Sequence, residues 1–294
     1  MEVGVCLPYM EGDLSRERIF EWYRRLDEGP FSSISCGERI TGSSQEMRVL
    51  LAGAAARTHR LRIVPSLYVL PMHSAVWAAK EVASLDVLSG GRVTLCVGVG
   101  GREADYRAVE ASFERRHPRL DEQVAEMRRI WRGEPPFPGA DPVGPQPLQE
   151  GGPPILAGAM GPKAIRRAAA WADGLYAWSG NGVASEIERV FELAEAAWAE
   201  AGRQAPPRRV AGFWYSLAPG GAERLREYVY GYLRVFGEEG ARAAAKLMDR
   251  ATPDAVRSSL DALEALGCEE VILVPASGEI AELDGAEQVL AERG

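Results

Sequence analysis

Short apolar segments alternate with amphipathic segments along almost the whole chain. A continuous apolar run bounded by turn residues is typical of a strand buried on both faces, whereas apolar residues at every third or fourth position are typical of a helix. The predicted strands are Val3–Leu7, Phe31–Cys36, Leu61–Leu70, Arg92–Val99, Ile155–Ala157, Gly174–Trp178, Arg208–Leu217 and Glu270–Pro275. The predicted helices are Ser15–Asp27, Gln45–Arg57, His73–Leu88, Arg119–Trp131, Lys163–Ala172, Ser185–Ala201, Ala222–Met248, Pro253–Leu266 and Glu279–Glu292.

This alternation indicates a parallel sheet that is covered by helices. Eight strand–helix units in one chain favour a closed (β/α)8 TIM barrel over an open sheet. The segment 133–154 is predicted to be a loop because it is rich in Pro and Gly. It does not separate two domains, because the strand–helix units on either side of it are incomplete without each other. We therefore expect one domain over residues 1–294, with its chemistry at the carboxyl ends of the strands.

The composition, 46% apolar and 26% charged residues, is ordinary for a globular enzyme. The net charge of −8 argues against a nucleic-acid-binding protein, and an anionic ligand would have to be held by a local site. The N-terminal sequence lacks the features of a signal peptide, and no apolar run is long enough to span a membrane, so we expect a cytoplasmic protein. The scattered Cys6, Cys36, Cys96 and Cys268 are expected to be buried free thiols rather than disulfides or metal ligands.

The glycine-rich segment Gly98–Tyr106 (GVGGREADY) follows the fourth predicted strand. Glycines there allow the backbone to approach a ligand closely and supply amide donors. The spacing does not match the GxGxxG motif of dinucleotide-binding sheets. We interpret the segment as part of a ligand site, with a tight turn between strand and helix as the structural alternative.

A second Gly-containing turn lies within Pro153–Ala169, between the fifth strand and a helix that starts near Pro162. A helix N-terminus presents unpaired N–H groups and a positive dipole end, which together suit an anion. Lys163 would add a positive charge. An ordinary strand–turn–helix connection explains the same residues, and both interpretations stay open.

Single residues near the strand ends are further candidates. His73 follows the third strand, where an imidazole could contact a substrate or simply cap the next helix. Cys36 has no evident base nearby that would activate it as a nucleophile. Trp178 and Trp214 lie at or within strands and are the best pocket candidates among the tryptophans. No zinc-protease, hydrolase or Walker motif occurs in the sequence.

Three segments together resemble the luciferase-like monooxygenases, which include enzymes dependent on the deazaflavin F420 or on FMN. These segments are Gly37–Ile40 (GERI), Lys80–Tyr106 with its LDVLSGGR stretch, and Pro153–Trp178. The resemblance covers most of the chain, except residues 205–268, and implies the TIM-barrel fold that the strand pattern predicts independently.

By position, the resemblance implies that Glu38 lies near the cofactor ring. It also implies that Ser66 and Leu67 form the non-proline cis peptide that backs the ring in many F420-dependent members. The residues implied along the ring or its side chain are Gly98, Val99, Gly100 and Gly101, and those implied at the phosphate are Gly158, Ala159, Met160 and Gly161.

The sequence departs from the pattern of these relatives in two places. Ala159 stands where relatives often carry a second glycine. Some F420-dependent dehydrogenases have a proton-donating glutamate directly after the glycine stretch, where this chain has Arg102. The candidates for a catalytic group are therefore His73, Arg102 and Tyr106.

The resemblance implies an oxidoreductase that transfers a hydride between F420, or alternatively FMN, and a small organic substrate. A monooxygenase reaction is also compatible with the resemblance. A non-catalytic barrel that binds flavin or F420 is the alternative. An aldolase is disfavoured because Lys80 and Lys163 fall on helices rather than in strands. Members of the family are often dimers, and we expect a homodimer. Substituting Gly100→Leu is expected to block cofactor binding and to leave the fold intact.

Overall fold

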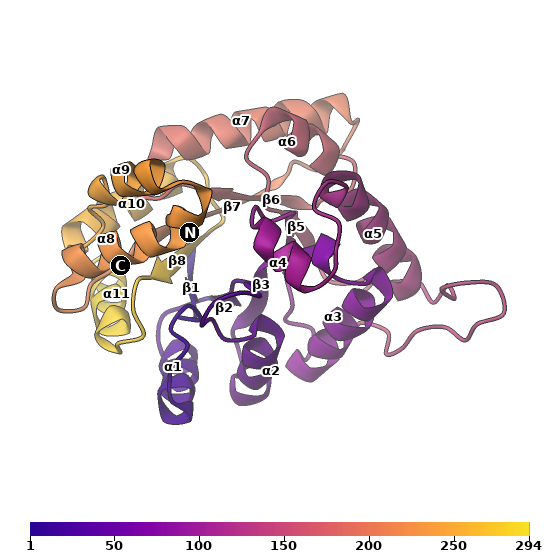
Figure 1. The fold of residues 1–294 in the computed structure, drawn as a ribbon, viewed down its shortest axis with the longest axis horizontal. Coiled ribbons are helices and arrows are strands. Elements are labelled where there is room, and N and C mark those ends of the chain that lie inside the picture. Colours follow the sequence, from indigo (N-terminus) through magenta and orange to yellow (C-terminus); the bar gives the residue numbers. More distant parts are fainter. Residues whose placement is uncertain (294) are drawn as a thin grey trace.

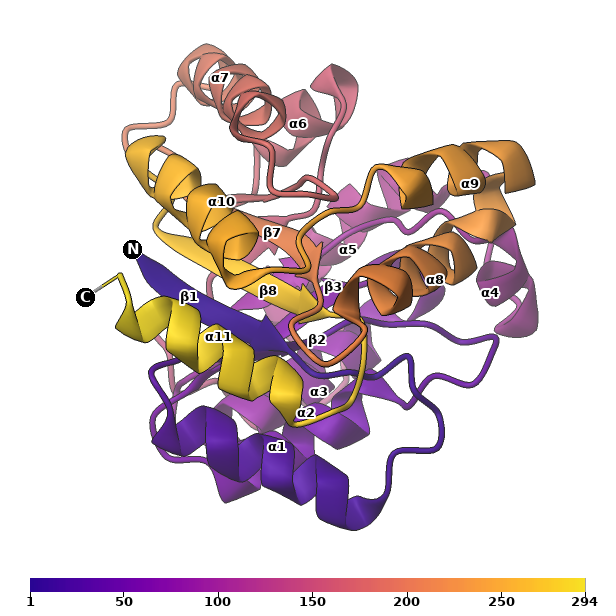
Figure 2. The same cartoon turned by 90° about the vertical axis from the view of Figure 1, so that its left-hand side faces the viewer.

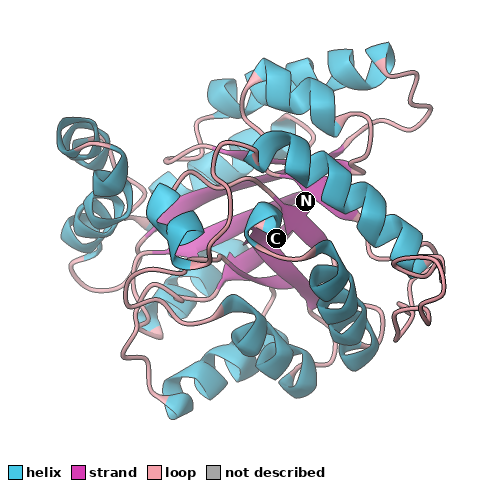
Figure 3. Ribbon diagram, turned by 45° about the vertical axis from the view of Figure 1, so that its right-hand side comes forward, coloured by secondary structure: helices cyan, strands magenta, loops and turns pink. Residues whose placement is uncertain are grey.

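The strands form a closed, all-parallel barrel in the computed structural model, which describes residues 1–293. The strands are β1 (Glu2–Cys6), β2 (Ser33–Cys36), β3 (Arg62–Tyr68), β4 (Leu95–Val97), β5 (Ile155–Ala157), β6 (Gly174–Trp178), β7 (Arg208–Tyr215) and β8 (Glu270–Pro275). Closure is direct, because Val5 of β1 is in register with Leu273 of β8 on one side and with Ile34 of β2 on the other. The predicted (β/α)8 barrel is confirmed, and Figure 3 shows the strands at the centre of a shell of helices.

The strands lack an apolar–polar alternation because both of their faces are covered. Every residue of β2 and of β8 is buried. The main polar exception is Glu270 at the amino end of β8, which lies 2.8 Å from the Arg62 guanidinium and accepts a hydrogen bond from Ser32 Oγ (2.8 Å). A buried charge of this kind is tolerated only when it is paired, and this pair lies at the end of the barrel away from the predicted site.

The helices surround the barrel in the order that the sequence predicts (Figure 1). They are α1 (Arg16–Glu28), α2 (Met47–Arg57), α3 (Ala75–Ser89), α4 (Glu103–Ala108), α5 (Arg116–Trp131), α6 (Pro162–Ala168), α7 (Ala184–Glu200), α8 (Gly221–Leu233), α9 (Glu238–Lys246), α10 (Pro253–Ala265) and α11 (Ala281–Ala291). Ser15 caps α1 as predicted, because its hydroxyl accepts a hydrogen bond from Arg18 N (3.2 Å). The segment 133–154 is a loop that extends away from the barrel between α5 and β5, as predicted.

The helical prediction was wrong in three places. The short helix α4 was not predicted, since six largely polar residues show no clear apolar period. The predicted helix Ala222–Met248 is divided into α8, a 3₁₀ turn (Arg234–Phe236) and α9, because Gly237 adopts φ = 138°, which lies outside the helical region. His73 lies outside α3, whose N-cap is Ser74, and ends a separate 3₁₀ turn (Leu70–Met72).

The carboxyl ends of the strands meet the additional helices. Figure 2 shows the arrowheads of β1, β7 and β8 pointing toward the side of the barrel where α4, α8 and α9 lie. These helices come from the connections after β4 and β7, and they partly cover that end of the barrel. No helix within residues 1–293 is long and apolar enough to cross a membrane.

Candidate active site

A cavity of about 320 Å³ opens at the carboxyl ends of the strands, where the chemistry of TIM barrels is found. Strand ends contribute Ser66 and Leu67 from β3 and Val274 from β8. The other residues of the cavity wall are Cys6, Tyr9, Ser35, Gly37, Glu38, Val69, Met72, Gly100, Gly101, Arg102, Asp105, Gly158, Met160, Tyr176, Trp178, Trp214, Tyr228, Tyr232, Leu233 and Phe236. The wall is thus mostly apolar and aromatic, with few charged groups.

Many of the predicted site residues meet at this cavity. Those in its wall are Glu38, Ser66, Leu67, Gly100, Gly101, Arg102, Gly158 and Met160. The two glycine-rich segments share one rim because β4 and β5 are neighbours, and Gly158 N donates to Val97 O (2.8 Å). The predicted residues outside the wall are His73, Gly98, Val99, Tyr106, Ala159 and Gly161, of which Val99 and Ala159 line an adjacent cavity of about 40 Å³.

The side chain of Leu67 lies between the two glycine-rich segments. The Ser66–Leu67 peptide bond is cis, as the resemblance implies. A Cβ atom on Gly98 would lie 2.7 Å from Leu67 Cδ1, and one on Gly158 would lie 2.3 Å from Leu67 Cδ2. Both glycines therefore make room for this leucine, in addition to any role of their backbone amides.

The following two glycines serve other neighbours. Gly100 adopts φ = 59°, and a Cβ there would lie 2.9 Å from Val69 Cγ1. A Cβ on Gly101 would lie 2.9 Å from Phe236 Cε1. The packing at Gly100 corrects the expectation that Gly100→Leu leaves the fold intact, since that substitution would strain the backbone and displace Val69.

Glu38 and His73 form a hydrogen-bonded pair at the edge of the cavity. His73 Nε2 lies 2.7 Å from Glu38 Oε1, and Glu38 Oε2 accepts a hydrogen bond from Val69 N (2.7 Å). The His73 carbonyl is held in turn by Gln123 Nε2 (2.7 Å), and the imidazole packs edge-on against Tyr68. Glu38 is the member that faces the cavity, so His73 reaches it only through this carboxylate.

Tyr106 is buried in α4 behind the glycine-rich turn. Its hydroxyl donates to the carbonyl of Val99 (2.5 Å), and its ring packs edge-on against Phe113. Burial raises the pKa of the Tyr106 phenol above its usual value. Tyr106 thus holds the turn in place from outside the cavity.

Arg102 is the one predicted catalytic candidate that forms part of the cavity wall. Its Nη2 atom donates to Thr41 Oγ1 (3.2 Å), and its Nε atom lies 3.3 Å from Asp105 Oδ2. Burial opposes the ionisation of Asp105, but hydrogen bonds from Thr41 and the charge of Arg102 outweigh it and lower the pKa of this carboxyl. Asp105 is therefore an anion at neutral pH and links α4 to the loop after β2.

Aromatic side chains from β6, β7 and α8 form a continuous wall. The Trp178 and Trp214 rings lie 4.8 Å apart in an edge-to-face arrangement, and Tyr232 lies 5.4 Å from Trp214. Trp178 and Trp214 were predicted as pocket residues and this is confirmed, whereas Tyr228 and Tyr232 were not singled out. Their spacing of four positions on one helix was the available signal, but it is also that of an ordinary core face. Burial raises the pKa of the Tyr228 phenol, which therefore remains neutral.

The cysteines provide no nucleophile. Cys6 lines the cavity, but burial raises the pKa of its thiol to about 11. Burial also raises the pKa of Cys36 well above its usual value, so neither thiol ionises at neutral pH. All four cysteines are free and buried, as predicted. Within residues 1–293, no group of three or more His, Cys, Asp or Glu side chains is arranged to hold a metal ion.

The cavity fits the ring of a flavin-type cofactor. A fused planar ring has two apolar faces and a polar edge, and such ligands occupy apolar clefts with a few well-placed polar groups. Leu67 and the aromatic wall supply the apolar surface. Ser35 Oγ is buried in the wall without a hydrogen-bond partner, so it could bond to the edge of such a ring.

Parts of the sequence are similar to those of known proteins. An uncharacterized protein of Mycobacterium tuberculosis is 33% identical over 172 residues, which cover 55% of this chain and 57% of that protein. The F420-dependent glucose-6-phosphate dehydrogenase of Nocardia farcinica is 31% identical over 163 residues, which cover 52% and 48% of the two chains. These matches span only about half the length of the curated relatives.

The fold has counterparts among solved structures. An F420-dependent secondary alcohol dehydrogenase in complex with an F420–acetone adduct superimposes with a TM-score of 0.80 at 18% identity, covering 98% of this chain and 97% of that one. At this identity the match establishes the fold alone. The model of the luciferase-like monooxygenase family matches residues 1–283. The chain therefore belongs to the luciferase-like monooxygenase family.

Proposed function

We propose that this protein is an oxidoreductase that transfers a hydride between F420 and a small organic substrate bound in the cavity. The observation that carries the proposal is the convergence of Leu67, the two glycine-rich turns and the aromatic wall on one cavity at the carboxyl ends of the strands. F420 is preferred because the Nocardia farcinica relative is an F420-dependent dehydrogenase. FMN is the alternative cofactor, and a monooxygenase reaction is the alternative chemistry.

The bound ring would accept or donate the hydride. The protein would orient it and exclude water, as in other cofactor enzymes. Leu67 and Gly100 would contact the ring, and the turn from Gly158 to Gly161 would face its phosphate. Trp178 and Trp214 would shield the substrate from water.

We assign the proton-handling role to the Glu38–His73 pair. His73 Nε2 lies 2.7 Å from Glu38 Oε1 at the cavity edge, where the carboxylate would exchange a proton with a substrate oxygen and the imidazole would hold the carboxylate in place. Arg102 would supply positive charge within the cavity, and Tyr106 would position the turn through Val99.

Titration of the purified protein with F420 and with FMN, followed by absorbance and fluorescence, tests the proposal. We expect binding of F420 in the micromolar range and oxidation or reduction of the bound cofactor in the presence of a substrate. Binding of FMN without binding of F420 would reverse the cofactor assignment. Binding without any substrate-dependent redox change, across a panel of alcohols, ketones and aldehydes, would favour the non-catalytic barrel.

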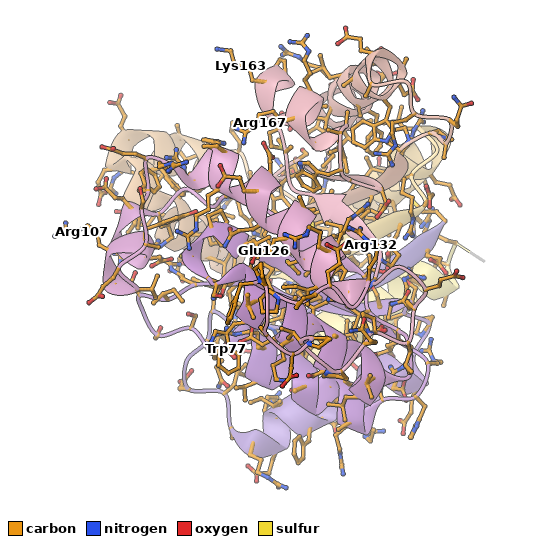
Figure 4. All side chains as sticks on the ribbon, turned by 90° about the vertical axis from the view of Figure 1, so that its right-hand side faces the viewer. Trp77, Arg107, Glu126, Arg132, Lys163 and Arg167 are labelled. Atoms are coloured by element: carbon orange, nitrogen blue, oxygen red, sulfur yellow. The ribbon has the colours of Figure 1, made fainter. Side chains whose placement is uncertain are left out.

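We further propose that the protein is a homodimer that associates through α2 and α3. Large apolar side chains are exposed there, with Val49 at 71%, Trp77 at 63% and Leu88 at 51% of their full exposure. Trp77 is among the side chains labelled in Figure 4. Exposed apolar patches of this kind mark interaction surfaces, and a second copy with the same patch would bury it by two-fold symmetry.

A further inference from the structure

One arginine side chain lies in the cavity wall, and a second lies near Tyr232 of the same wall. Arg102 belongs to the cavity wall, and Arg39 follows Glu38 in the loop after β2. The Arg39 guanidinium lies 5.9 Å from the centre of the Tyr232 ring, and its Nη1 atom lies 3.5 Å from Met10 Sδ. Burial, followed by the nearby charge of Arg102, lowers the pKa of Arg39 below its usual value.

Both guanidinium groups have N–H donors that form no hydrogen bond with the described residues. Arg39 Nε and Arg102 Nη1 are buried and have no hydrogen-bond partner among the described residues, and Arg102 Nε has only the ion-pair contact with Asp105. The thioether of Met10 is only a weak acceptor for Arg39. Buried donors in native proteins are nearly always satisfied, and this set is therefore well suited to an acceptor that arrives with a ligand.

The carboxylates nearby do not neutralise both charges. Asp105 lies beside Arg102, but its Oδ1 atom already accepts hydrogen bonds from Thr41 N and Thr41 Oγ1. Glu38, the other carboxylate of the cavity wall, is occupied by His73 and Val69 N. Among the described residues, Arg39 thus has no carboxylate within ion-pair distance, whereas Arg102 is paired with Asp105.

We propose that Arg39 and Arg102 bind the carboxylate of an organic substrate whose apolar body contacts the aromatic wall. Guanidinium groups bind carboxylates through charge-assisted hydrogen bonds, and the Trp214 and Tyr232 rings suit a planar or cyclic apolar body. The inference rests on the proposed function, since it names the substrate class of the same cavity.

The cofactor's phosphate is the other anion that could reach these arginines. We favour the substrate because Arg39 is held by Met10 and Tyr232, from the loop after β1 and from α8. The turn expected to face the phosphate follows β5, three strands away from the loop after β2 that carries Arg39.

Binding of benzoate, with neutral benzamide as the matched probe, tests the proposal by calorimetry on the protein with and without F420. We expect benzoate to bind at least about tenfold more tightly than benzamide. The variants Arg39→Gln and Arg102→Gln should lose that preference and keep the affinity for F420. Arg39→Lys and Arg102→Lys keep the charge without the forked donors and should give an intermediate affinity.

Arg107→Gln is the matched control, because this arginine lies on the same helix as Asp105 and is exposed, with its side chain at the edge of the molecule in Figure 4. It should leave both affinities unchanged. Equal binding of benzoate and benzamide, or loss of F420 or FMN affinity in the Gln variants with benzoate unaffected, would overturn the proposal. Arginine-dependent benzoate binding by a protein that binds neither cofactor would uphold the anion site and refute the proposed function instead.

Discussion

The packing of Leu67 against Gly158 gives a direct test of where the cofactor ring lies. In a Gly158→Ala variant the new methyl group would start 2.3 Å from Leu67 Cδ2. Because carbon atoms in contact are separated by about 3.5–4.0 Å, the leucine must move by roughly 1.2–1.7 Å. On its other side the leucine already fills the space that Gly98 leaves open, since a Cβ there would lie only 2.7 Å from Leu67 Cδ1. We therefore expect the displaced side chain to move into the cavity that it lines.

Two effects should follow from this displacement. Overpacking of this size costs about 1–3 kcal/mol of unfolding free energy, and each kcal/mol lowers the Tm of a chain this long by roughly 2–4 °C. A leucine pushed into the ring site should weaken cofactor binding by at least about tenfold, which corresponds to ~1.4 kcal/mol. Differential scanning fluorimetry without ligand measures the first effect, and fluorescence titration with F420 and FMN measures the second.

Gly161→Ala is the control in the same turn, because no atom lies within 4 Å of its Cβ position. It should change the affinity for cofactor little, and the loss of the glycine N-cap on α6 should lower the free energy of unfolding only slightly. Should Gly158→Ala remain folded and bind both cofactors with unchanged affinity, the ring does not pack against Leu67 and the assignment of this cavity to the cofactor is refuted.

Four further substitutions test other parts of the structure. Gly285→Ala in α11 places a Cβ 2.5 Å from Leu217 Cβ and should destabilise the protein, whereas Gly231→Ala in α8 has open space and should stabilise it by about 0.5–1 kcal/mol, both measured by urea denaturation. The folded protein lowers the pKa of Asp105, so the ionised carboxylate contributes to stability at neutral pH, and this contribution is lost as the pH falls below about 4. The difference in unfolding free energy between wild type and Asp105→Asn should therefore be smaller at pH 3 than at pH 7. Trp77→Glu should convert a dimer into a monomer in sedimentation velocity, while a wild-type protein that is itself monomeric contradicts the proposed interface.

Much of the barrel was predictable because its strands are buried on both faces. A run such as Glu270–Pro275 is apolar almost throughout, so its identity as a strand does not depend on the side of the sheet that each residue faces. The additional helices were harder to predict. The six residues of α4 are mostly polar, and the break at Gly237 depends on a backbone angle that a single glycine permits but does not demand.

The sequence predicted which residues lie near the candidate site, but it did not predict which side chains contact one another there. Residues at the ends of neighbouring strands must lie near one another, which placed Glu38, Leu67 and Gly158 at one rim. Which way a side chain points was not available from the sequence. His73 follows β3 and was a candidate either to contact a substrate or to cap the next helix, yet it lies behind Glu38, a partner 35 positions earlier in the chain.

The glycines of the cavity show why contacts carry information that a motif lacks. A glycine-rich turn at the end of a strand indicates that something occupies the space of the missing Cβ atoms, and a ligand is the simplest occupant to propose. Here that space is filled from within the protein, at Gly98 and Gly158 by Leu67 and at Gly101 by Phe236. The glycine pattern is therefore a property of the wall that would support the ring. A substitution at these positions therefore affects a ligand through the side chain that it displaces. A ligand-bound structure of Gly158→Ala would test this directly, because it would show where the Leu67 side chain has moved.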